Sequence, residues 1–291
     1  MRAADRQAPA GQPSQRFRWR RFLPARRSMR LLWAASALAV VAGLALSPAA
    51  ARDVSAHLRS PGASAEPTVG ALFSLQPDGK LGSHFCTASV IDSPGANLLL
   101  TAAHCVTGRA VSEMAFVPDY GDGKVPYGIW TVRQVIVDSK WQASADPDDD
   151  FAFLVVSQHG TTSGIEDLTG GELLGVSQSP DQRVEVAGYP DSHDAPITCA
   201  NAATAFSPTQ LEFDCNGFTD GTSGSPLLAP AARPGGMATV IGVIGGYEQG
   251  GDTASVSYAA RFGSRIEALY QTAMAASGLR SALAGYRIDV R

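Results

Sequence analysis

The 291-residue sequence predicts an all-β domain, a sandwich or a barrel of short strands, over most of its length. From Pro67 onward, short apolar runs of strand length alternate with turn signals, and no helical stretches separate them. The 30 glycines and 18 prolines favour many turns over long helices. Apolar residues make up 45% and charged residues 17%, a balance that allows a sizeable core.

The first 51 residues have the pattern of an export signal. An arginine-rich region precedes an uncharged apolar run over residues 31–46, which is short for a membrane-spanning helix of roughly 20 residues. Ala49 and Ala51 then have the spacing of a signal peptidase site. We therefore expect residues 1–51 to be a signal peptide, cleaved after Ala51, and the mature chain to be secreted. An uncleaved anchor, twin-arginine export and a start at Met29 stay open.

The charge of the remaining chain excludes one class of partner. Residues 52–291 carry 14 basic and 26 acidic residues without a basic cluster, which argues against nucleic-acid binding. No pattern implies a metal or an organic cofactor. We expect a monomer that would touch a membrane only through an uncleaved signal sequence.

The four cysteines form an even set, as expected of an exported chain. They lack the C-x-x-C spacing of zinc sites. Pairing sequence neighbours joins Cys86 to Cys105 and Cys199 to Cys215, and each short loop would contribute roughly 3 kcal/mol by the chain-entropy model. Four cysteines allow three connectivities, so this pairing is one of three.

Two series of strands follow a polar segment, residues 52–66, that we interpret as a flexible mature N-terminus or a short pro-segment. The first series predicts strands at 69–75, 87–91, 97–101, 129–137 and 151–156. The second predicts strands at 183–188, 211–215, 226–228, 240–245 and 255–259. These series divide one domain, 67–275, into halves at about 67–160 and 175–262.

A single convincing helix closes the domain. Ile266, Leu269, Tyr270 and Ala273 fall on one face of a helix over 264–275. Residues 276–291 are expected to be a C-terminal tail.

The first chemical motif is Thr101-Ala102-Ala103-His104-Cys105. A histidine follows a buried strand and precedes a cysteine whose nearest candidate partner is Cys86. A bridge there would clamp the backbone beside the imidazole, as a general base requires, since its nitrogen must stay within hydrogen-bond reach of a hydroxyl. The alternative is a histidine of the core at the end of a strand.

The second motif places acids ahead of the apolar strand 151–156. A carboxylate drawn into the interior needs a partner, and an imidazole N–H suits it. Asp150 is the candidate because it abuts the strand, whereas Asp148 and Asp149 are expected in a solvated acidic loop.

The third motif is Gly221-Thr222-Ser223-Gly224-Ser225, in which glycines let a substrate carbonyl approach the backbone of a serine. The amides of Gly221 and Ser223 could converge on a developing oxyanion. Ser223 is the candidate nucleophile, and Ser225 is its competitor.

Together, in the order His104, Asp150, Ser223, these motifs resemble the three signature blocks of chymotrypsin/trypsin-like serine proteases. Ser-Gly-Ser-Pro after Thr222, and the segment 186–190, resemble the secreted bacterial branch that includes glutamyl endopeptidases. The resemblance covers roughly residues 67–273. It implies two six-stranded antiparallel β-barrels with His104, Asp150 and Ser223 as a catalytic triad in the cleft between them, and protein or peptide substrates.

Two departures from the family bear on function. In many members an acid precedes the nucleophilic serine and pairs with a newly cut N-terminus, but Thr222 stands there. The position six before the serine, acidic in trypsin-like members, is Gly217, or Asn216 if the loop is one residue longer, so we expect no preference for Arg or Lys. Phe218 and the edge Gly245-Gly246-Tyr247 are the expected pocket walls.

Two other classes compete with an active protease. An α/β-hydrolase would need Gly-x-Ser-x-Gly and alternating helices and strands, which this chain lacks. A catalytically inactive, protease-like binding domain would lose a triad member or an oxyanion glycine, and all of these residues are present.

Overall fold

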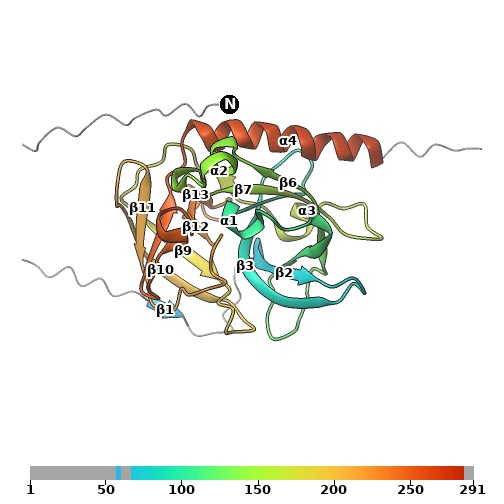
Figure 1. Ribbon diagram of the computed structural model, residues 1–291, viewed down its shortest axis with the longest axis horizontal. Coiled ribbons are helices and arrows are strands. Elements are labelled where there is room, and N and C mark those ends of the chain that lie inside the picture. Colours follow the sequence, from blue (N-terminus) through green and yellow to red (C-terminus); the bar gives the residue numbers. More distant parts are fainter. Residues whose placement is uncertain (1–56, 60–66, 285–291) are drawn as a thin grey trace, which may run out of the picture. The chain divides into compact units, whose positions relative to one another are not determined.

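The computed structural model describes residues 57–59 and 67–284. The expected signal peptide 1–51, nearly all of the segment 52–66 and the last residues of the expected tail lie outside these ranges. The all-β prediction with two barrels and a C-terminal helix is confirmed (Figure 1).

The first half of the domain is a closed six-stranded barrel in the order β2-β3-β4-β7-β6-β5. Every neighbouring pair in it is antiparallel. The strands are β2 (Val69–Leu75), β3 (Leu81–Ile91), β4 (Leu98–Thr101), β5 (Met114–Pro118), β6 (Trp130–Val137) and β7 (Ala152–Ser157). The sequence did not predict β5, although all five of its residues are buried.

The second half is a curled sheet in the order β14-β11-β10-β9-β12-β13-β8, with β1 (His57–Arg59) added on β10. It is more open than the expected six-stranded antiparallel barrel, because only an isolated bridge between Ile244 and Ala259 joins the end of β13 to β14, and β8 pairs with β13 in parallel. The strands are β8 (Leu173–Leu174), β9 (Gln182–Gly188), β10 (Ile197–Ala205), β11 (Gln210–Asp214), β12 (Pro226–Ala229), β13 (Thr239–Val243) and β14 (Val256–Ala260).

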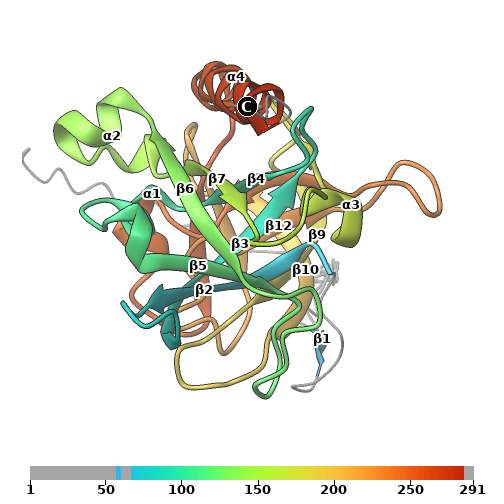
Figure 2. The same ribbon diagram turned by 90° about the vertical axis from the view of Figure 1, so that its right-hand side faces the viewer.

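Short helices occupy the connections between strands. They are α1 (Ala103–Val106), α2 (Ser139–Ser144), α3 (Glu166–Thr169) and the 3-10 turns η1 (Val111–Glu113), η2 (Pro147–Asp149) and η3 (Tyr247–Gly250). The closing helix α4 (Ser264–Ala284) begins where expected but runs nine residues past 275, through the first part of the expected tail. It packs along the first barrel, against β4, β6 and β7 (Figure 2). Among the described residues, no helix is both long and apolar enough to cross a membrane.

Three apolar cores hold the domain. One fills the first barrel around Leu72, Phe116 and Trp130, and another fills the second around Val186 and Phe213. The third lies between the two halves and takes in the inward face of α4. Ile266, Leu269 and Ala273 are buried in this third core, as the periodicity predicts.

Arg265, the second residue of α4, ties the closing helix to the loop before β7. Its Nε donates to Asp149 Oδ1 at 2.5 Å, and its Nη2 pairs with Asp138. The side chain of Asp149 is 1% exposed. Burial raises the pKa of Asp149, and the hydrogen bond from Arg265 opposes that shift. The arginine therefore supplies a positively charged partner to a buried carboxyl group one residue before Asp150.

We expect Arg265→Ala to lower the free energy of unfolding by roughly 2–3 kcal/mol, because it leaves Asp149 buried without its cation. The figure is below that of a fully buried pair because the arginine side chain is 38% exposed. Urea unfolding of the variant measures the loss. Arg233→Ala, at an exposed position between β12 and β13, should change stability by less than about 0.5 kcal/mol. Equal losses in the two variants would contradict this role.

Glu166, at the start of α3, forms a carboxyl pair with Asp92. Burial, followed by the hydrogen bond and charge of Asp92, raises the pKa of Glu166 to about 7. The amide of Ser93 donates to Glu166 Oε2 at 3.0 Å and acts in the opposite direction. The folded protein thus holds a proton here that the unfolded chain releases at a lower pH.

The stability that this proton contributes is present below pH 4.5, the ordinary pKa of glutamate, and is lost as the pH rises through about 7. We expect Glu166→Gln to remove that loss, so the variant should gain stability relative to the parent as the pH rises from 4.5 to 8. Thermal unfolding at both pH values, in a Ser223→Ala background to prevent self-digestion, measures the difference. A difference that does not depend on pH would contradict the shared proton.

Candidate active site

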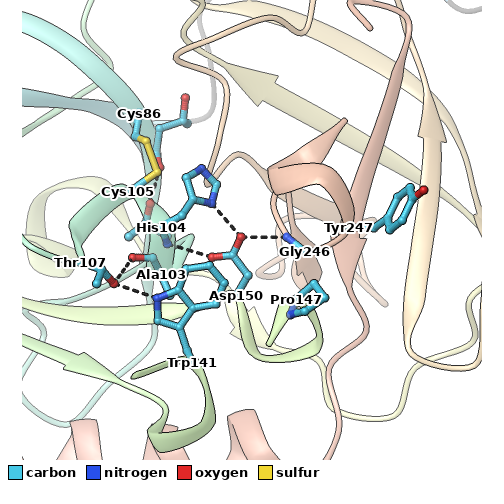
Figure 3. A network of polar contacts seen from close by, with 12 residues as sticks. Cys86, Ala103, His104, Cys105, Thr107, Trp141, Pro147, Asp150, Gly246 and Tyr247 are labelled. Atoms are coloured by element: carbon cyan, nitrogen blue, oxygen red, sulfur yellow. Dashed lines mark hydrogen bonds and ion pairs between the residues drawn. A yellow bond between two sulfur atoms is a disulfide. The ribbon is translucent and has the colours of Figure 1, made fainter. Parts of the chain in front are cut away.

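His104 is held at the mouth of the first barrel by three covalent and hydrogen-bonded ties. It lies in α1, directly after β4, and the Cys86–Cys105 disulfide joins α1 to β3. Its backbone amide donates to Asp150 Oδ1 at 2.9 Å. Its ring Nδ1 lies 2.7 Å from Asp150 Oδ2 (Figure 3). With Nδ1 on the carboxylate, Nε2 is the nitrogen left for chemistry.

Asp150 has no exposed side-chain surface and accepts three hydrogen bonds. Two come from His104, and the third comes from the amide of Gly246 to Oδ2 at 2.9 Å. A buried carboxylate is tolerated only when it is paired in this way. The carboxylate thus fixes the orientation of the ring.

Glycines 245 and 246 have a role that the sequence did not suggest. A side chain at Gly245 would place its Cβ 2.9 Å from Asp150 Oδ2, and Gly246 has a φ of +79°. Both positions therefore let the backbone of the second half approach the carboxylate. They were expected as pocket walls, but neither lines the pocket described below.

The two acids before Asp150 do not form a solvated loop. Asp149 is buried against Arg265, and Asp148 Oδ1 accepts from Gln210 Nε2 at 2.7 Å. Gln210 also accepts the amide of Tyr247 at 3.1 Å, so it links η2 to η3. The expectation failed because sequence position alone does not reveal an arginine more than 100 residues away.

Ser223 and His104 line the same cleft. The cleft has a volume of about 590 Å³, and Gly221, Arg109 and Asp252 are among its other walls. The carbonyl of Ser223 accepts the amide of Thr87, on β3, at 2.8 Å. Ser225 is fully buried, and its hydroxyl donates to the carbonyl of Thr222 at 2.6 Å. It has no access to a substrate.

The loop before Ser223 presents two free amides. Within the described part of the chain, the amides of Gly221 and Ser223 donate to no protein group. Gly221 has a φ of +92°, and a Cβ there would lie 2.5 Å from the amide nitrogen of Asp191 and the carbonyl oxygen of Tyr189. Only glycine fits this approach. The arrangement can bind an anionic oxygen beside the serine.

Of the three possible connectivities, the structure contains Cys86–Cys105 and Cys199–Cys215. The second bond joins β10 to the end of β11. Within the described ranges, only Cys86, His104 and Cys105 bring enough ligand atoms together to suggest a metal. Because both sulfurs are in the disulfide, this group lacks the thiolates that a metal would require.

A pocket of about 250 Å³ opens beside Ser223. Its walls are Phe218, Thr219, Asp220, Thr222, Ser223, Ile244, Gln249, Gly250, Gly251, Asp252, Thr253 and Ala254. Of the four expected wall residues, Phe218 lines it. Gly217, next to Asn216, supports the pocket through its amide, which donates to the carbonyl of Ala254 at 2.7 Å.

Tyr247 and the acidic edge of the pocket also differ from expectation. Tyr247 packs against Phe206 and Tyr258, with ring centroids 5.1 Å apart in both cases. The sequence missed Asp252, which belongs to a glycine-rich stretch with no fixed distance from the serine motif. Asp220 and Asp252 both border the pocket, so carboxylates are near it although Gly217 carries none.

Comparisons with known proteins agree with this fold. Residues 82–261 match the model of the trypsin-like peptidase domain. No curated protein sequence matches the chain.

Several solved structures are similar at low sequence identity. The protease Anisep from Arthrobacter nicotinovorans is 23% identical, with a TM-score of 0.62 over 76% of this chain and 99% of that one. The thermostable serine protease AL20 from an extremophilic microorganism is 22% identical, with a TM-score of 0.59 over 72% and 98%. A Glu endopeptidase is 17% identical, with a TM-score of 0.56 over 76% and 96%.

Likeness at these identities shows a shared fold. The domain match covers more than half of the sequence and includes the segments that carry His104, Asp150 and Ser223. The chain therefore belongs to the trypsin-like peptidase family, whose members are serine proteases.

Proposed function

We propose that this protein is a secreted serine endopeptidase that hydrolyses peptide bonds through an acyl-enzyme, with His104, Asp150 and Ser223 as its catalytic triad. The observation that carries the proposal is the buried carboxylate of Asp150, held by His104 and Gly246 while the imidazole lines one cleft with Ser223. A structural histidine would not need its second nitrogen directed to an open cleft.

The roles follow from this geometry. His104 Nε2 takes the proton of the Ser223 hydroxyl as the oxygen attacks the peptide carbonyl, and later gives it to the leaving amine. Asp150 fixes the tautomer of His104 and stabilises the imidazolium. The free amides of Gly221 and Ser223 stabilise the oxyanion, which is the larger electrostatic contribution in such sites. A water then hydrolyses the acyl-enzyme by the same steps.

Secretion belongs to the proposal because of two features. Both disulfides need an oxidising compartment to persist, and the sequence of residues 1–51 has the pattern of a signal peptide. Protein or peptide substrates, and no cofactor, are implied by the same chemistry.

We expect Ser223→Ala to abolish covalent labelling by a fluorophosphonate and to reduce peptide hydrolysis at least 10³-fold, because the nucleophile is lost. Active-site titration with intact mass spectrometry measures the labelling, and circular dichroism checks the fold.

Ser225→Ala is the matched control and should still be labelled, because Ser225 is buried. If labelling survives in Ser223→Ala and disappears in Ser225→Ala, the nucleophile is Ser225 and the assignment of Ser223 is wrong. A correctly folded parent that is neither labelled nor active would favour the alternative, a catalytically inactive, protease-like binding domain.

The carboxylates beside the pocket bear on substrate choice. Asp220 and Asp252 border it, and no lysine or arginine is among its lining residues. Arg109 lines the wider cleft but not this pocket, and it is bound to other cleft residues: its Nε donates to the carbonyl of Cys105, and its guanidinium lies 3.9 Å from the ring centroid of Phe85. An acidic substrate side chain would meet repulsion without a compensating cation.

We therefore expect little cleavage after Glu or Asp, unlike the activity named for the Glu endopeptidase neighbour. Asp252→Asn should raise kcat/KM for a Glu substrate relative to its Gln analogue by roughly fivefold, about the effect of one partly screened like charge. A peptide-library profile at low and high salt measures both expectations. Asp78→Asn, a change in the exposed turn between β2 and β3, should leave the ratio unchanged. A preference for Glu in the parent would refute this account of the pocket.

A further inference from the structure

The loop that carries Gly221 must be ordered without a buried charge. Thr222 stands where many family members have an acid, and its hydroxyl donates to the carbonyl of Thr219 at 2.7 Å. That bond closes a turn within the loop, as does the bond from the amide of Thr222 to the same carbonyl at 3.0 Å. Neither bond attaches the loop to the rest of the domain.

Thr87, on β3 of the first barrel, makes that attachment. Its fully buried hydroxyl donates to the carbonyl of Gly221 at 3.1 Å and accepts the amide of Tyr189 at 2.9 Å. Its own amide donates to the carbonyl of Ser223 at 2.8 Å. One residue thus holds the carbonyls on both sides of Thr222.

The position of Thr87 is itself fixed. Its carbonyl accepts the hydroxyl of Thr101 at 2.8 Å, which joins β3 to β4. The preceding residue, Cys86, is covalently bonded to Cys105. A rigid anchor of this kind is needed if a hydroxyl is to hold a loop in one conformation.

The hydroxyl of Thr87 also acts indirectly, through residues 189–191, on the peptide unit that contains the Gly221 amide. In a trans peptide the C=O and N–H point in opposite directions. The carbonyl of Asp220 accepts the amide of Asp191 at 2.8 Å, so the amide of Gly221 must point away from that strand end. Asp191 is two residues after Tyr189, whose amide is bound to Thr87. Thr87 therefore binds residues near both partners of the Asp191–Asp220 hydrogen bond, which directs the Gly221 amide.

We propose that Thr87 is a positioning residue for the oxyanion hole: its hydroxyl, between the amide of Tyr189 and the carbonyl of Gly221, sets the direction of the Gly221 amide in place of an ion pair at position 222. The inference rests on the proposed function, because it assigns an oxyanion role to Gly221. It predicts an effect on the transition state that exceeds the effect on substrate binding.

The test compares Thr87→Val with Thr87→Ser. Valine has the shape of threonine without the hydroxyl, whereas serine keeps the hydroxyl. We expect Thr87→Val to lower kcat 10- to 100-fold with KM within about threefold, somewhat less than the loss of a whole oxyanion donor. Affinity for a peptide aldehyde, which forms a tetrahedral oxyanion on the serine, should fall in parallel with kcat/KM. Thr87→Ser should restore at least a third of the activity.

Thr198→Val is the matched control, because Thr198 on β10 is buried and its hydroxyl has no partner among the described residues. It should leave kcat unchanged. Hydrogen exchange of peptides spanning 187–193 gives a readout that does not need activity, and Thr87→Val should speed exchange at the Tyr189 amide.

The outcomes separate this inference from the proposed function. An inactive parent would contradict the proposed function. The exchange measurement would then still test the hydrogen bond between the Tyr189 amide and the Thr87 hydroxyl. If the parent is active and Thr87→Val leaves kcat unchanged, or raises KM without lowering kcat, the positioning role is overturned. The same holds if serine fails to restore what valine removes.

Discussion

The buried carboxylate of Asp150 is the constraint on which the site depends. An ionised group without solvent requires donors, and here they come from both halves of the domain: two from His104 and one from the amide of Gly246. Separating the halves would remove the Gly246 bond and leave the carboxylate with the two donors of His104 alone. Fold stability and the orientation of the imidazole therefore depend on the same contacts.

Thr87 makes a second connection between the two halves. It belongs to the first barrel, but its partners Tyr189, Gly221 and Ser223 belong to the second half. The proposed nucleophile and oxyanion donors are thus held in position by the same barrel that carries His104. Short, rigid connections between these groups keep their mutual distances within the tolerance that proton transfer and oxyanion binding require.

The sequence predicted the fold class and the three chemical motifs because these depend on local patterns. Apolar runs and turns reveal strands such as β9, and a histidine after a buried strand stands out without any knowledge of contacts. It missed β10, which has four alanines among its nine residues and gains its strand conformation from pairing with β9 and β11. Propensity does not report such tertiary pairing.

The same limit explains the errors at the site. In the sequence, Asp149 has the pattern of a solvated acid, but in the structure it is bound by Arg265 on α4. Asp252 has the pattern of a loop residue, but in the structure it borders the pocket. Thr87 attracts no attention in the sequence, because a threonine after a cysteine is ordinary in a strand. These roles arise from contacts between segments that lie far apart in the chain.

Replacing a charged tether with neutral hydrogen bonds changes how an oxyanion loop can be controlled. An ion pair to a chain terminus forms only after that terminus has been released, and its strength depends on pH and salt. The bonds around Thr87 join groups that do not titrate, are fully buried and exist as soon as the two halves have packed. If they direct the Gly221 amide, folding alone completes the oxyanion hole. Any delay of activity after folding must then come from another source, such as access to the cleft or the formation of the disulfide next to Thr87.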